Sequence, residues 1–173
     1  MKFAYADPPY IGQAAKHYDC AEVNHEVLLA RLMDEFPDGW ALSASSPSLR
    51  EIIRMPLYPE KARIGAWVKP FCSFKKNVNP AYAWEPVIFY GGRRKGTGKH
   101  IETERDWCAE SITLRKGLSG VKPLGVCYWI FEMLGMCKCD EFHDLFPGSG
   151  AVTKAWEMFV ASQSQPPVKN DVG

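Results

Sequence analysis

The chain lacks any apolar stretch close to the roughly 20 residues that a membrane-spanning helix needs. The best candidate, Tyr128 to Met136, is short and carries Glu132. The N-terminus also lacks the apolar segment of a signal peptide, because Lys2 is followed by a short strand pattern and then by Asp7. We therefore expect a cytoplasmic protein with no membrane partner.

Net charge is nearly absent as well. The formal net charge is +1 at pH 7, so any contact with nucleic acid must come from a local patch. The six cysteines form no CxxC pair and have no matching histidine spacing, and Cys137-Lys138-Cys139 is too tight for a usual zinc site. We expect reduced structural thiols and no metal.

The chain does contain an alternation of strand and helix patterns over 173 residues, a length that suits one domain. Strands are predicted at 2–6, 40–44, 63–68, 85–90 and 141–146, and helices near 24–36, 46–53, 122–134 and 151–160. The expected inward side chains of the first two helices are Val27, Leu28, Leu32, Phe36, Leu49, Ile52 and Ile53. This order predicts an α/β fold whose mostly parallel sheet is covered by helices on both faces.

Two segments break the alternation. Residues 93–120 are charged, rich in glycine and weakly periodic, which predicts an exposed loop or small insert. Residues 162–173 contain Pro166-Pro167 and little that could pack, which predicts a flexible tail.

The tetrapeptide Asp7-Pro8-Pro9-Tyr10 follows the first predicted strand. The Asp7 carboxylate and a backbone carbonyl beside a proline can both accept hydrogen bonds from an exocyclic NH2 group. The prolines fix φ and remove backbone donors, and the Tyr10 ring can stack on a flat base. This motif predicts a site that holds an amine-bearing ring.

A second motif, Asp144-Leu145-Phe146-Pro147-Gly148-Ser149-Gly150, lies between the last predicted strand and the last predicted helix. Glycines at such a turn let a ligand approach the backbone, and the following helix offers free N–H groups. In open α/β sheets, ligands bind outside the carboxyl ends of strands where the strand order reverses. If the two strands are neighbours, one motif would hold a nucleoside cofactor and the other the acceptor amine.

Together the two motifs resemble those of the S-adenosylmethionine-dependent amino-methyltransferases of DNA, with D-P-P-Y/F at the catalytic strand and D-x-F-x-G-x-G at the cofactor strand. Lys122-Pro123 resembles the Lys-Pro that begins the helix before the cofactor strand in that family. The catalytic motif precedes the cofactor motif, as in the permuted beta class. The resemblance covers roughly residues 2–160 and extends to small methylases of actinobacterial phages, so a bacterial or phage-infected cell is the expected setting.

The resemblance implies a Rossmann-like methyltransferase sheet, circularly permuted and shortened, with one antiparallel strand. It implies a single methyltransferase domain at 1–161 with a recognition insert near 93–120. It also implies S-adenosylmethionine as cofactor and adenine N6 in DNA as acceptor. The implied catalytic residues are Asp7, Pro8, Pro9 and Tyr10, and the implied cofactor-binding residues are Lys122, Pro123, Asp144, Phe146, Gly148, Ser149 and Gly150.

The resemblance has one departure. The family continues past the cofactor helix to a strand whose terminal acidic residue binds the ribose, whereas Asp171 follows a segment that does not have a strand pattern. Four alternatives therefore stay open, namely cytosine N4, RNA adenosine, a protein amide, or a non-catalytic nucleic-acid-binding subunit. Single-stranded DNA or a homodimer would ease the cost of extracting a base from a duplex.

A basic run supplies the expected DNA contacts: Arg93, Arg94, Lys95 and Lys99, joined by His100 and extended by Lys75 and Lys76. The alternative is a solvated loop. Trp84 is expected in the core, with base stacking as the alternative. Lys69-Pro70 and Phe71 are expected at the acceptor side, and His17 and Tyr18 on a loop that closes over substrate.

Overall fold

The computed structural model describes residues 1–12, 22–71, 76–94, 96, 103–112 and 121–164. Six strands form one sheet in the order β5-β3-β4-β2-β1-β6. Their bounds are β1 Lys2–Ala6, β2 Gly39–Ser43, β3 Arg63–Val68, β4 Trp84–Gly91, β5 Trp107–Ala109 and β6 Glu141–Asp144. β4 is antiparallel to both of its neighbours and the other pairs are parallel, so the expected single antiparallel strand is confirmed.

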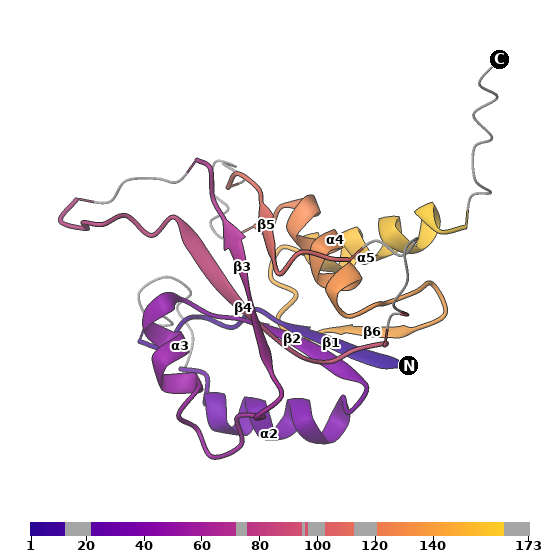
Figure 1. Cartoon of the computed structure of the whole chain (residues 1–173), viewed down its shortest axis with the longest axis horizontal. Coiled ribbons are helices and arrows are strands. Elements are labelled where there is room, and N and C mark those ends of the chain that lie inside the picture. The colour runs from indigo at the N-terminus through magenta and orange to yellow at the C-terminus, as the bar shows by residue number, and fades with distance from the viewer. Residues whose placement is uncertain (13–21, 72–75, 95, 97–102, 113–120, 165–173) are drawn as a thin grey trace.

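Helices cover both faces of this sheet, as Figure 1 shows. α2 (His25–Glu35) and α3 (Ser46–Ile52) lie on one face, and α4 (Leu124–Met133) and α5 (Ala151–Ser162) on the other. Side chains alternate between the two cores along each strand, as the pleat requires. On β1, Ala4 and Ala6 join the core of α2 and α3, whereas Phe3 and Tyr5 join the core of α4 and α5.

Local chemistry explains where the helices begin. The Asn24 side chain accepts hydrogen bonds from the N–H groups of Glu26 and Val27 and thereby caps α2. Ser45 caps α3 in the same way through Ser48 N. Gly150 precedes α5 with φ at +74°, a left-handed conformation that glycine adopts without steric cost.

The structure corrects three details of the predicted elements. Val27 and Ile53 were expected inward but are 64% and 42% exposed. Val27 lies outside the buried face of α2, and Ile53 is the C-cap residue that follows α3. The last strand ends at Asp144 instead of residue 146. Within the segment expected as an exposed loop, Trp107–Ala109 form β5, because they pair with the open edge of β3.

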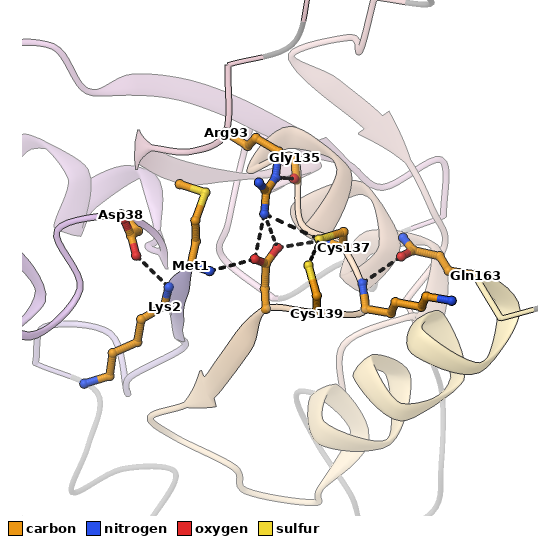
Figure 2. A network of polar contacts seen from close by, with 10 residues as sticks. Met1, Lys2, Asp38, Arg93, Gly135, Cys137, Cys139 and Gln163 are labelled. Carbon is orange, nitrogen blue, oxygen red and sulfur yellow. Dashed lines mark hydrogen bonds and ion pairs between the residues drawn. The ribbon is translucent and has the colours of Figure 1, made fainter.

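A network of hydrogen bonds and ion pairs joins the amino ends of β1 and β6. It lies at the opposite ends of these strands from the two motifs. Figure 2 shows the terminal amine of Met1 and the Arg93 guanidinium converging on Asp140, at 2.9 and 2.6 Å from Oδ1. Oδ2 of Asp140 also accepts from Cys137 N at 2.8 Å. These donors lower the pKa of the buried Asp140 carboxyl to about 2, although burial opposes them. Arg93 is therefore part of a structural ion pair.

No helix in the described part of the chain is long and apolar enough to cross a bilayer.

Candidate active site

The two sequence motifs lie side by side, as the sequence analysis expected. β1 and β6 are parallel neighbours, with Tyr5 opposite Asp144, and Leu145 N donates to Tyr5 O at 2.9 Å. Because the carboxyl ends of parallel strands share one edge, Asp7 and the glycine turn emerge together from the sheet. The chain continues from β1 to α2 on one face of the sheet and from β6 to α5 on the other face (Figure 1). This is the switch point where α/β sheets bind ligands.

The side chain of Asp7 contacts Lys122, which lies two residues before the start of α4. Lys122 Nζ lies 3.1 Å from Asp7 Oδ1. Burial raises the pKa of the Asp7 carboxyl above its ordinary value, while the Lys122 cation pulls it down. The ion pair thus favours the ionised carboxylate, the form that can only accept hydrogen bonds.

Lys122 also lies 3.1 Å from Oε2 of Glu85, a residue near the start of β4. Lys69 pairs with the other oxygen of this carboxylate, and the Tyr10 hydroxyl donates to Oε2 at 2.6 Å. Burial would raise the pKa of Glu85, but the two lysine cations dominate and lower it to about 2. Glu85 therefore connects Asp7 and Tyr10 through shared hydrogen-bond partners.

Lys122 itself is buried. Burial alone would lower the pKa of its ammonium group, but the nearby Asp7 and Glu85 carboxylates help to raise it well above its ordinary value. Its Nζ lies 5.1 Å from the centre of the Trp67 ring, which adds a cation–π contact. The sequence motif at Lys122-Pro123 thus places a positive charge beside Asp7, the first residue of the Asp-Pro-Pro-Tyr motif.

In the glycine turn, the Asp144 carboxylate faces its own loop and helix. Its oxygens accept hydrogen bonds from Phe146 N at 3.3 Å and from Thr153 Oγ1 at 3.1 Å. Gly148 and Gly150 have φ values of +46° and +74°, and a Cβ atom built on Gly150 would meet no heavy atom within 4 Å. The backbone at Gly150 therefore borders open space that a ligand can enter. The exposed Ser149 lies between these glycines.

Two of the expected nucleic-acid contacts, Arg93 and Arg94, do not reach this edge. Arg93 is bound to Asp140 at the opposite edge, and Arg94 is exposed directly after it. Lys75, Lys95, Lys99, His100, His17, Tyr18 and Asp171 lie outside the described residues. Trp84, expected in the core, is the first residue of β4 and is 41% exposed.

Sequence reasoning missed Glu85 as a site residue. A single acidic residue between Trp84 and Pro86 gives no periodic signal, and its partners come from three other segments of the chain. Only the pairing of Trp67 with Glu85 across β3 and β4 places this carboxylate next to Lys69 and Lys122.

Cys137, Cys139 and Asp140 form the one cluster in the described ranges whose ligand atoms lie close enough for a metal ion. Both Asp140 oxygens already accept from the terminal amine, from Arg93 and from Cys137 N. The cluster therefore belongs to the structural network of Figure 2.

No protein-family model and no curated protein matches the sequence. The fold does match a solved structure, that of the M1.HpyAVI–SAM complex, with a TM-score of 0.63 and 16% sequence identity over 92% of this chain and 78% of that chain. This likeness and the strand order define a Rossmann-like methyltransferase fold.

Proposed function

We propose that this protein is an S-adenosylmethionine-dependent DNA methyltransferase that modifies the exocyclic N6 amine of adenine. The observation that carries the proposal is the adjacency of Asp7 and the glycine turn at one edge of the sheet. A site of this kind brings a methyl donor and an acceptor amine into one pocket, and such positioning supplies much of the catalytic power of transfer enzymes.

The glycine turn fits the cofactor because the backbone at Gly150 is open to solvent and precedes the free N–H groups of α5. When bound, S-adenosylmethionine supplies an electrophilic methyl carbon on a sulfonium. The same ligand is present in the M1.HpyAVI–SAM complex, which supports this choice.

The acceptor amine is a poor nucleophile because its lone pair is delocalised into the ring. In the proposed mechanism the Asp7 carboxylate and the Pro8 carbonyl accept hydrogen bonds from the two N–H groups of the amine. These hydrogen bonds turn the lone pair of the nitrogen toward the methyl group. Bound S-adenosylmethionine would supply the methyl group for attack by this nitrogen, and its sulfur would keep the electron pair of the broken carbon–sulfur bond. The displaced proton leaves from the nitrogen to Asp7 or to water.

Lys122 and Glu85 prepare these groups for the reaction. The Lys122 cation favours the ionised form of Asp7, and Glu85 fixes the hydroxyl of Tyr10, whose ring is then positioned to stack on the base. Such preorganised electrostatics costs no rearrangement at the moment of transfer.

The second candidate is a non-catalytic nucleic-acid-binding subunit with the same fold. It is favoured by the position of β6, which has β1 as its single partner within the described residues. The family's ribose-binding acidic strand would lie on the other side of β6. Cytosine N4, RNA adenosine and a protein amide are alternative acceptors for the same chemistry.

Two measurements test the proposal. Calorimetry with S-adenosylmethionine reports cofactor binding, and nucleoside mass spectrometry of DNA from expressing cells identifies the modified base. We expect N6-methyladenine with the native chain, none with Asp7→Ala, and unchanged cofactor affinity in that variant. Asp34→Ala, a change on α2 away from the site, is the matched control. Absence of cofactor binding at millimolar concentration would favour the non-catalytic candidate.

A further inference from the structure

A pocket of about 500 Å³ opens beside the start of β4, outside the network described above. It is lined by Ser46, by residues 77–82 and by Trp84. Two of the lining side chains are large exposed aromatics, with Tyr82 at 55% and Trp84 at 41% exposure. Large aromatic rings are usually among the buried side chains, so two at one pocket indicate a surface that binds something.

This pocket and the candidate active site share one edge of the sheet. β3 runs parallel to β1, because each of β2 and β3 is antiparallel to β4. The carboxyl end of β3 and the start of β4 therefore lie at the edge where Asp7 emerges. In Figure 1 residues 76–83, which lead into β4, extend beyond this edge of the sheet.

Trp84 and Glu85 are consecutive residues with opposite orientations. Side chains alternate along β4, so Glu85 belongs to the face of α4 and Trp84 to the face of α3. Glu85 binds Tyr10 at 2.6 Å, and the ring of Trp84 borders the pocket on the other side of the same strand. The candidate active site and the pocket therefore lie on the two sides of the first residues of β4.

The charge of the segment suits a polyanion. Residues 69–83 contain three lysines and no acidic residue. Of the two lysines that the structure describes there, Lys69 is bound to Glu85, whereas Lys76 is exposed next to the lining residue Asn77. Aromatic rings combined with a local positive charge are the usual elements of a surface that binds single-stranded nucleic acid.

We propose that Tyr82 and Trp84 form a stacking platform for a base of single-stranded DNA that flanks the target adenine, with Lys76 contacting the phosphate. This inference rests on the proposed function for the identity of the strand. A stacking platform requires bases that are free of a duplex, so the surface selects unpaired DNA. The polar side chains of Ser46, Asn77 and Asn79 give the rim hydrogen-bonding groups that a second copy of an apolar surface would not need.

The test is fluorescence anisotropy with the full chain and a labelled 12-nucleotide single strand of mixed sequence. We expect Trp84→Ala and Tyr82→Ala each to weaken binding about tenfold, which matches the typical value of one base stack. Trp84→Phe keeps a ring and should retain most of the affinity. Lys76→Ala should lower the salt dependence, reducing the slope of log affinity against log salt by about 0.7. The control is Trp107→Ala, since Trp107 is equally exposed but does not line the pocket.

Circular dichroism and thermal melting identify any variant that fails to fold. If Trp84→Ala does not fold, the affinities of Trp84→Phe and Tyr82→Ala are compared instead. Equal binding by the native chain and by both alanine variants would overturn the inference. So would equal affinity for the matched duplex, tighter binding of RNA of the same sequence, or a dimer that dissociates in Trp84→Ala while DNA binding is unchanged.

The failure of this inference and that of the proposed function are distinguishable. Strand binding that depends on Trp84, without any methyl transfer, would refute the proposed function and retain the platform. Methyl transfer to a single strand with an unchanged KM in Trp84→Ala would retain the proposed function and refute the platform.

Discussion

Lys122 Nζ lies 3.1 Å from Asp7 Oδ1, and this contact joins the segment that leads into α4 to the first residue after β1. The same ammonium group is shared with Glu85 at 3.1 Å. One buried cation therefore offsets two carboxylates at the proposed site of methyl transfer.

Replacing Lys122 by methionine should destabilise the fold by about 3–5 kcal/mol, because it leaves two carboxylates in a buried place without their shared cation. The pKa of Asp7 should rise further, since the charge that opposes burial is gone. Methyl transfer should then need a higher pH than in the native protein. Denaturant unfolding and the pH profile of transfer measure both effects.

The matched control is Lys154→Met, at an exposed position of α5. Equal stability of Lys122→Met and the native protein would contradict the role assigned to the cation.

Glu85 should make the free energy of unfolding depend on pH in the acid range. Its pKa is about 2 in the folded protein against an ordinary 4.5, so the folded state binds the proton more weakly than the unfolded chain. The stabilisation is present above pH 4.5 and is lost as the pH falls toward 2, to a total of about 3 kcal/mol. Guanidinium unfolding at pH 2.5 and pH 7 should show a smaller difference for Glu85→Gln than for the native chain.

Tyr10 should act through its ring more than through its hydroxyl. Tyr10→Phe removes the hydrogen bond to Glu85 and keeps the stacking face, so we expect a loss of less than tenfold in kcat/KM. Tyr10→Ala removes both and should lose about 10- to 100-fold. A larger loss in Tyr10→Phe than in Tyr10→Ala would refute the stacking role.

Asp140 should matter for stability and not for ligand binding. Asp140→Asn removes the charge that Arg93 and the terminal amine share, which should cost about 3 kcal/mol of unfolding free energy. Cofactor and strand affinities should stay within twofold. Arg93→Met should also lower stability and leave strand affinity unchanged, with the exposed neighbour change Arg94→Met as its control. Weaker strand binding by Arg93→Met would restore the DNA-contact role expected from the sequence.

Gly150 tests the cofactor turn. Gly150→Ala should destabilise by about 1–2 kcal/mol through the left-handed backbone, and Gly150→Asn by less, since asparagine tolerates that conformation. Both variants should weaken S-adenosylmethionine binding measured by calorimetry, because each adds a Cβ in the space that is open at this turn. If Gly150→Asn bound S-adenosylmethionine with native affinity, the turn would require only the left-handed backbone conformation and not the absence of a side chain.

Strands with strong apolar patterns were predictable from the sequence. The prediction for β3 matches its bounds, Arg63–Val68, and the prediction for β1 matches Lys2–Ala6, because short apolar runs bounded by turn residues carry their own signal. β5 was not predictable, since three residues are too few for a pattern and their strand form comes from pairing with β3. Lys122-Pro123 was recognised as a motif, but its ion pair with Asp7 was not foreseen.

The sequence by itself determined the two motifs, their order along the chain and the alternation of strands and helices, because these depend on residue type and local spacing. Only the tertiary structure decided that Glu85 joins Lys122 to Tyr10, that Arg93 lies at the opposite edge, and that Trp84 borders a pocket. Those facts depend on strand order and register, which arise from contacts between segments distant in the chain. The local propensity of a segment for helix or strand does not depend on such contacts and cannot predict them.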